Sequence, residues 1–215
     1  KNLVFSIKDK CRVCYTCVRE CPVKAIRIFN GQAEVIPERC IACGNCVRVC
    51  SQDAKVFIDS REQVKIMLRD ERPVYAIIAP SFPAEFKEIE DYRILVGMIR
   101  MLGFDKVMEV SFGADMVARE YNKLLGSNGE KHYISSDCPA IVNYIENYYP
   151  DLVPALAPIV SPMVALSRVI RQKYGEEPLI VFIGPCIAKK AESDEIDEAI
   201  TFRELRKLFE EFQYS

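Results

Sequence analysis

Two cysteine runs with the same spacing constrain this chain more than any other feature. The first, C-R-V-C-Y-T-C-V-R-E-C, spans residues 11–21, and the second, C-I-A-C-G-N-C-V-R-V-C, spans residues 40–50. In each run, three cysteines at steps of three are followed by a fourth at a step of four. That spacing wraps three thiolates around one four-iron cube and turns the fourth cysteine toward a neighbouring cube. The sequence therefore predicts two 4Fe–4S clusters.

Each cluster is expected to take its fourth ligand from the other run. One ligand set is then Cys11, Cys14, Cys17 and Cys50, and the other is Cys40, Cys43, Cys46 and Cys21. Zinc fits this pattern poorly, because structural zinc sites use C-x2-C pairs that lie far apart. A disulfide scaffold also fits poorly, since it needs an oxidising compartment that nothing in the sequence indicates.

Short strand-forming segments flank the cysteines, at residues 3–7, 25–29, 33–36 and 55–58. The dipeptide Asn30-Gly31 between the second and third segments is a strong hairpin signal. Residues 1–60 resemble the bacterial two-cluster ferredoxins. The resemblance predicts an α+β ferredoxin-like module as the first domain.

Residues 61–215 alternate apolar runs with amphipathic stretches and are expected to form the second domain. The apolar runs, which predict strands, are 74–80, 106–110, 132–138 and 179–185. The stretches between them predict helices that end at glycines or begin at prolines. Thr201 and Glu204 form a capping box for a last helix. This alternation predicts an α/β domain with a parallel sheet.

Cys138 and Cys186 are the two cysteines outside the runs, and each follows a predicted strand and adjoins a proline. Ligands of parallel sheets gather beyond the carboxyl ends of the strands. A redox or metal role at that edge is therefore predicted for both. The alternative for each is a small buried hydrophobic residue, which is the commoner fate of cysteine.

Longer motifs around these cysteines resemble one family. P-C-I-A-K-K-A-E at 185–192 resembles the second signature of the FeFe hydrogenase catalytic domain, and S-S-D-C-P at 135–139 resembles the first, usually Thr-Ser-Cys-Cys-Pro. Residues 78–80, 103–116 and the later I-T-F-R-E-L are also similar to that family. The likeness covers residues 61–215 and implies a partial H-cluster domain.

The resemblance implies a 4Fe–4S cube joined through a cysteine to a di-iron centre. Cys138 and Cys186 would be two ligands of the cube, and Lys189 would donate a hydrogen bond to a di-iron cyanide. Glu192 matches the acidic position of the signature, for which the alternative is an ordinary surface carboxylate. The third signature, with its two further cysteines, does not occur before Ser215. We therefore expect a truncated chain that is inactive by itself.

Several positions depart from the family pattern. Asp137 stands where productive hydrogenases carry a cysteine that relays protons, and Tyr121 and Leu124 stand where they place relay glutamates. Gly184 replaces the usual methionine. These departures predict slow turnover or a role in sensing H2.

Two functions follow from these observations. The first is a hydrogenase-like redox protein that passes electrons through both clusters to an H-cluster-type site for reversible H2 oxidation. The alternative is an electron-transfer or iron–sulfur carrier protein that has a hydrogenase-like fold and no di-iron site. Iron counting separates them, since two cubes hold about eight irons and an H-cluster adds to that number.

Charge patterning bears on partners and location. Residues 1–30 carry seven Lys and Arg against Asp9 and Glu20, which is either a solvated face or a docking face for an acidic redox partner such as a ferredoxin. No basic motif is interleaved with aromatic residues, so nucleic acid is not expected. The sequence has no apolar run long enough for membrane insertion and no signal peptide, which predicts a cytoplasmic protein. The apolar run at 153–164 predicts an oligomer or a covering partner.

Overall fold

The computed structural model describes residues 2–127 and 131–213, and its internal contacts divide the chain into two compact units. The first, here called the cysteine-rich unit, comprises Lys1–Ile58, Cys138–Leu156 and Cys186–Glu192. The second, the sheet unit, comprises Asp59–Asp137, Ala157–Pro185 and Ser193–Ser215. The segments that carry Cys138 and Cys186 thus group with the N-terminal residues, while the division into domains at residue 60 stays a prediction.

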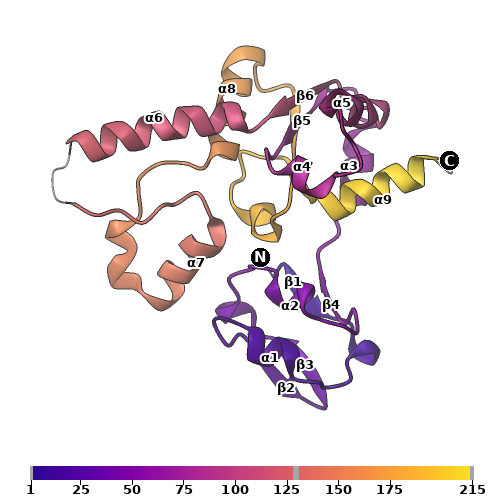
Figure 1. The fold of residues 1–215 in the computed structure, drawn as a ribbon, viewed down its shortest axis with the longest axis vertical. Coiled ribbons are helices and arrows are strands. Elements are labelled where there is room, and N and C mark those ends of the chain that lie inside the picture. The colour runs from indigo at the N-terminus through magenta and orange to yellow at the C-terminus, as the bar shows by residue number, and fades with distance from the viewer. Residues whose placement is uncertain (1, 128–130, 214–215) are drawn as a thin grey trace. The chain divides into compact units, whose positions relative to one another are not determined.

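Two small antiparallel sheets frame the cysteine-rich unit (Figure 1). Strand β1 (Val4–Ser6) pairs with β4 (Lys55–Phe57), and β2 (Ile26–Phe29) pairs with β3 (Gln32–Val35). Asn30 and Gly31 join β2 to β3 with φ angles of 47° and 70°, as the type I′ turn of a two-residue hairpin requires. The predicted hairpin is therefore confirmed.

Short helices complete this unit. The first half has the 3-10 turn η1 (Lys8–Lys10) and helix α1 (Thr16–Glu20), and the second half has η2 (Pro37–Arg39) and α2 (Asn45–Arg48). The later segments contribute α7 (Pro139–Tyr148), η3 (Pro150–Ala155) and η4 (Ile187–Ala191). Pro139 begins α7 at its first turn, where the missing N–H has no partner to lose.

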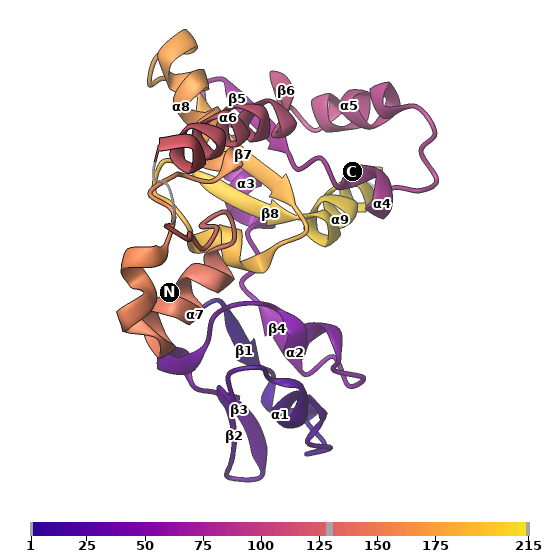
Figure 2. The ribbon, with the colours of Figure 1, turned by 60° about the vertical axis from the view of Figure 1, so that its left-hand side comes forward.

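A four-stranded parallel sheet forms the centre of the sheet unit (Figure 2). Its order is β6 (Lys106–Glu109), β5 (Val74–Ile78), β7 (Leu179–Gly184) and β8 (Glu198–Thr201). Every residue of the two central strands, β5 and β7, is buried. This is the reason that their sequences are continuous apolar runs rather than alternating ones. The predicted parallel α/β sheet is thus present.

One predicted strand is wrong. Residues 132–138 add no strand to the sheet and contain only an isolated bridge residue, Ile134. The polar side chains that follow bond locally instead, since Ser135 Oγ donates to Asp137 Oδ2 at 2.9 Å, and such local bonds compete with a ladder. The fourth strand is β8, which has no long apolar run of its own. His132, in the same segment, is exposed.

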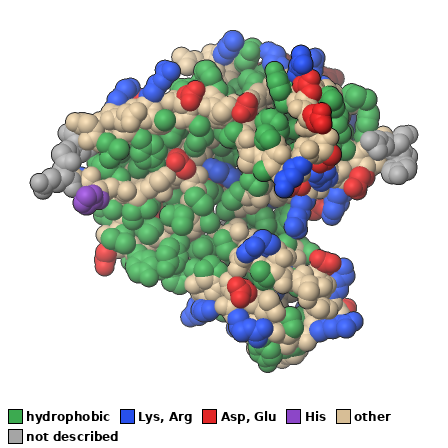
Figure 3. Space-filling model, viewed as in Figure 1, with side chains coloured by type: hydrophobic (Ala, Val, Ile, Leu, Met, Phe, Trp, Pro, Cys, Tyr) green, Lys and Arg blue, Asp and Glu red, His purple; other side chains and the backbone are tan. Residues whose placement is uncertain are grey.

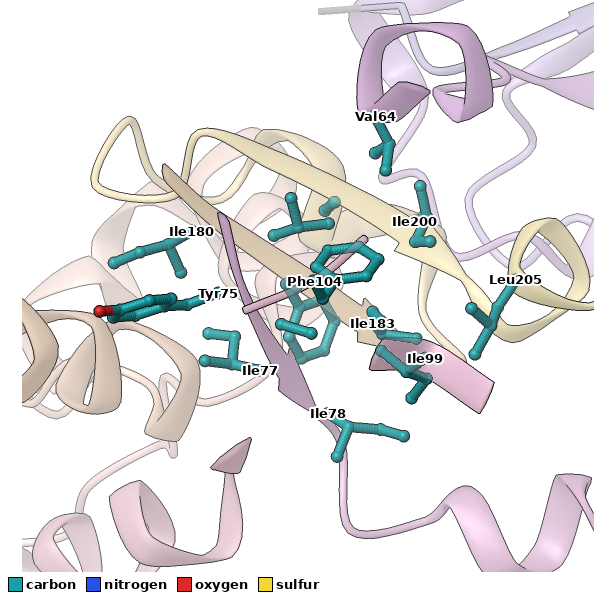
Figure 4. Close-up of a cluster of buried hydrophobic side chains, with 14 of the residues drawn as sticks. Val64, Tyr75, Ile77, Ile78, Ile99, Phe104, Ile180, Ile183, Ile200 and Leu205 are labelled. Carbon is teal, nitrogen blue, oxygen red and sulfur yellow. The ribbon is translucent and has the colours of Figure 1, made fainter. Parts of the chain in front are cut away.

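Helices pack around the sheet and bury its side chains. They are α3 (Arg61–Met67), α4 (Phe82–Glu85), α5 (Tyr92–Met101), α6 (Ser111–Ser127), α8 (Pro162–Tyr174) and α9 (Phe202–Gln213). Figure 4 shows side chains such as Val64, Ile99, Ile183, Ile200 and Leu205 meeting in this core, each less than 2% exposed. Among the helices of the described ranges, none has both the length and the apolar character needed to cross a bilayer.

Two local contacts fix helix positions in this unit. Helix α6 approaches α8 so closely that a Cβ at Gly113 would lie 2.1 Å from the carbonyl oxygen of Pro162. The capping box is confirmed: Thr201 N–H and Oγ1 donate to Glu204 Oε2 at 2.7 and 2.8 Å, and Glu204 N–H donates to Thr201 Oγ1. The other carboxylate oxygen of Glu204 accepts from Ser60 N–H, which ties the start of α3 to α9.

Candidate functional site

The cysteines of the two runs surround two hollows in the cysteine-rich unit. Cys11, Cys14, Cys17 and Cys50 line the first, which has about 370 Å³ of empty space, open solvent included. Cys21, Cys40, Cys43 and Cys46 line the second, of about 330 Å³. The structure therefore brings together each set of four cysteines that the exchange of fourth ligands predicted.

The loops that form each hollow contain residues with left-handed backbone conformations. Among the residues that the structure describes, six other than glycine have positive φ. The loops contain equivalent pairs that are 29 residues apart: Val13 and Ala42, Tyr15 and Gly44, Lys24 and Asp53. A β-branched residue such as Val13, with φ of 54°, is strained there. Strain of this kind persists where the surrounding structure demands it, and it concentrates at functional sites.

Backbone N–H groups point at the cysteine sulfurs. Ala25 N–H donates to Cys21 Sγ at 3.2 Å, and its equivalent Ala54 donates to Cys50 Sγ at 3.3 Å. In the second hollow, Ala42 N–H donates to Cys40 Sγ at 3.4 Å. Donors to sulfur stabilise thiolate and tune cluster potentials. The donor set thus fits thiolate-bound 4Fe–4S clusters.

Burial sets the acid–base behaviour of these thiols. Desolvation raises the pKa of Cys46 to about 12 and also raises those of Cys17 and Cys40. Hydrogen bonds with Thr16 lower the pKa of the exposed Cys14. Coordinated metal deprotonates a thiol outright and so reverses the effect of burial. In the described part of the chain, no three His, Cys, Asp or Glu side chains converge on a single-ion site.

Cys138 and Cys186 lie at the beginnings of two elements of the same unit. Cys138 is exposed and precedes α7, while the half-buried Cys186 precedes η4. The two elements are in contact. Ala140 of α7 and Ala188 of η4 are buried in one apolar cluster, against which Cys46 and Cys186 both pack. The structure thus joins the Cys186 segment to a ligand loop of the second hollow.

Lys189 and Glu192 form a close ion pair at the end of η4. Their Nζ and Oε2 atoms are 2.5 Å apart, and the two side chains are 14% and 13% exposed. A pair this well shielded from water is screened little by salt. Glu192 is therefore held by Lys189 and is not an ordinary surface carboxylate.

Asp137 belongs to the sheet unit and ends a chain of hydroxyl groups. Ser136 N–H donates to Tyr121 Oη, Tyr121 Oη donates to Ser135 Oγ at 3.3 Å, and Ser135 Oγ donates to Asp137. Two positions that the sequence singled out as departures, Tyr121 and Asp137, are thus connected. No sequence pattern indicated that Ser135 would link them.

Comparisons with known proteins agree with this geometry. Residues 3–51 match the family described as a 4Fe-4S dicluster domain, and residues 72–215 match the iron only hydrogenase large subunit, C-terminal domain. The chain belongs to the iron-only hydrogenase large-subunit family. Iron hydrogenase 1 of Clostridium pasteurianum is 30% identical over 169 residues, which cover 66% of this chain and 29% of that protein.

The predicted family membership is confirmed, and the chain is an iron–sulfur redox protein of the iron-only hydrogenase family. It spans less than a third of the length of the hydrogenase that it matches.

Two residues near the hollows were not predicted from the sequence. Tyr148 Oη donates to Val23 O and Arg39 O, and Lys55 is buried beside the first hollow. A comparison of positions 29 residues apart would have found Lys55, because Ile26 is its equivalent.

Proposed function

We propose that this chain conducts electrons through two 4Fe–4S clusters to an H-cluster-type site, where H2 is reversibly oxidised at a slow or sensing rate. The observation that carries the proposal is the apolar cluster in which Cys46 and Cys186 pack together. Ile187 also lies against Gly44, in the loop between Cys43 and Cys46. A ligand loop of one cluster is therefore in direct contact with the segment that would hold the next.

The residues that would hold the H-cluster here are Cys138 and Cys186. When bound, that group supplies the iron centre at which protons and electrons interconvert with H2. The Lys189 ammonium, fixed by Glu192 at 2.5 Å, would supply a cationic donor to an anionic group of the cluster, three residues after Cys186. The half-buried Cys186 packs against an apolar cluster that contains Ala140 and Ala188.

The proton path is proposed to run through the hydroxyl chain of the sheet unit. Asp137 takes the place of the family's relay cysteine, and its carboxylate accepts from Ser135. Ser135 in turn accepts from Tyr121. Hydroxyl groups can pass a proton along such a chain only when each both donates and accepts, which Ser135 and Tyr121 do.

The redox partner is proposed to be an acidic protein that docks on the cysteine-rich unit. Lys8, Lys10, Arg12, Arg19 and Lys24 are all exposed near the first hollow's ligand run. Figure 3 shows basic side chains spread over the part of the surface that contains α1 and β2. Because Cys14 is the exposed ligand of that set, this face offers a short route for electrons. Complementary charge mainly raises the rate of encounter.

Metal content and infrared spectra test the proposal. The reconstituted chain should bind about eight irons in two cubes. Maturation of a longer chain that includes the third signature, with its two further cysteines, should add irons and give CO and CN stretching bands that respond to H2. Eight irons without such bands would favour the alternative, an electron-transfer or iron–sulfur carrier protein with no di-iron site. Fewer than eight irons would contradict both.

A further inference from the structure

Lys55, the buried lysine of β4, differs in kind from its counterpart when the two cysteine runs and their flanking strands are aligned by sequence. Shifting by 29 residues places Lys55 on Ile26 and Ser6 on Val35. Ile26 and Val35 are cross-strand partners in β2 and β3, and Ser6 and Lys55 are cross-strand partners in β1 and β4. One half of the repeat thus has an apolar pair where the other has a lysine and a serine.

Lys55 is as buried as its apolar counterpart. It is 3% exposed and Ile26 is 6% exposed. Its ammonium donates to Ser6 Oγ and, at 2.6 Å, to the carbonyl oxygen of Ala33. Both acceptors are neutral, and among the residues that the structure describes no carboxylate forms an ion pair with Lys55. A buried charge without an opposite charge is expensive, so a counter-charge is required.

The cysteine thiolates supply that counter-charge. Lys55 lines the hollow of Cys11, Cys14, Cys17 and Cys50. Lys55 therefore lies next to the ligands of the first hollow. This ligand set becomes anionic when it binds a cluster, and the cluster becomes more so when it takes up one electron.

We propose that Lys55 is the buried counter-ion of the cluster in the first hollow and holds its reduction potential higher than a neutral side chain would. The proposal rests on the two clusters of the proposed function. A fixed positive charge in a low-dielectric interior stabilises the reduced cluster more than the oxidised one. The effect is largest for the cluster in the hollow that Lys55 lines.

The test uses the full 215-residue chain, reconstituted with iron and sulfide and titrated with dithionite while the reduced clusters are followed by electron paramagnetic resonance. In Lys55→Met, the ratio of reduced to oxidised cluster at a fixed potential should fall about tenfold, which is about 59 mV for a one-electron couple. Lys55→Arg keeps the charge and should stay near the wild-type potential. Lys8→Met removes an exposed charge of the same unit and serves as the matched control.

The outcomes separate this inference from the proposed function. If the wild-type chain binds about eight irons and Lys55→Met has unchanged potentials, the counter-ion role is wrong while the two clusters stand. An equal shift in Lys8→Met would also overturn it, since any surface charge would then do the same. If Lys55→Met and Lys55→Gln do not bind the clusters and Lys55→Arg does, cluster binding requires the positive charge, which supports the counter-ion role of Lys55. Failure of all three variants to load would assign Lys55 to packing and contradict it.

Discussion

Ile187 lies directly over the backbone of Gly44: a Cβ at position 44 would be 2.8 Å from Ile187 Cδ1. Gly44 also has a φ of 76°, so both the backbone and the space above it favour glycine. The contact joins the loop between Cys43 and Cys46 to the residue after Cys186. This contact lies on the proposed electron path, which makes it the first place to test.

Gly44→Ala should lower the thermal stability and the iron content of the cysteine-rich unit. The backbone penalty is about 1 kcal/mol, and displacement of Ile187 adds to it. Gly31→Ala is the matched control, because Gly31 has a φ of 70° with no atom within 4 Å of its added Cβ. Adding Ile187→Ala should recover part of the loss in Gly44→Ala. Equal losses in the two glycine variants would show that the contact contributes nothing.

Paired cysteine substitutions test the exchange of fourth ligands. Cys17→Ala with Cys50→Ala removes two ligands from one hollow, so about four irons should remain. Cys17→Ala with Cys21→Ala removes one ligand from each hollow, although both residues belong to the same run. The second pair should reduce the signals of both clusters. Retention of one intact cluster in the second pair would mean that each run serves its own cluster.

Removal of the Glu204 carboxylate should destabilise the sheet unit by about 3 kcal/mol. Glu204 is 2% exposed and accepts from Ser60 N–H and Thr201 N–H, so Glu204→Ala leaves buried donors without acceptors. Glu210→Ala, at an exposed position of the same helix, is the control. Urea unfolding followed by circular dichroism measures both. A change below about 1 kcal/mol would contradict this account of the cap.

Asp137→Cys should raise H2 turnover in the full-length, matured protein, because it restores the cysteine that relays protons in the productive hydrogenases that this chain resembles. Asp137→Asn cannot relay a proton and should lower turnover by about a hundredfold. Infrared bands of the matured variants verify that the iron site is equally filled. Unchanged turnover in both variants would remove Asp137 from the proton path.

Tyr121→Phe provides a separate test of the hydroxyl chain. The variant loses the hydroxyl that donates to Ser135 and accepts from Ser136 N–H, while the ring remains. Turnover should fall and its solvent deuterium isotope effect should rise. Ser193→Ala, a hydroxyl deletion elsewhere in the sheet unit, should change neither quantity. If Tyr121→Phe also changes neither, protons reach Asp137 by another route.

Sequence reasoning worked where local chemistry decides the structure. The buried strands at 74–78 and 179–184, the Asn30-Gly31 hairpin and the Thr201–Glu204 cap all follow from residues near one another in the chain. The predicted strand at 132–138 is wrong because Ser135 and Asp137 bond locally. Strand β8 was not predicted, because its four residues form no long apolar run and its place in the sheet comes from pairing with β7.

In the candidate site, too, some features follow from the local sequence and others depend on the tertiary structure. Cysteine spacing alone assigned the two sets that line the two hollows. The hydroxyl chain from Tyr121 to Asp137 depends on a loop returning to a helix, which spacing does not reveal. Lys55 looked like an ordinary strand residue, and its burial follows from the pairing of β1 with β4.

The hydroxyl of Tyr148 bridges Val23, just after the first cysteine run, and Arg39, just before the second. Helix α7, more than a hundred residues downstream, thus holds these two N-terminal segments together, and the Tyr148 contact is here called the clasp. A peptide of residues 1–60 would lack this clasp, and its two halves should open more readily. Residues 1–60 are therefore not freely portable, and a graft of them into another protein would need α7 as well.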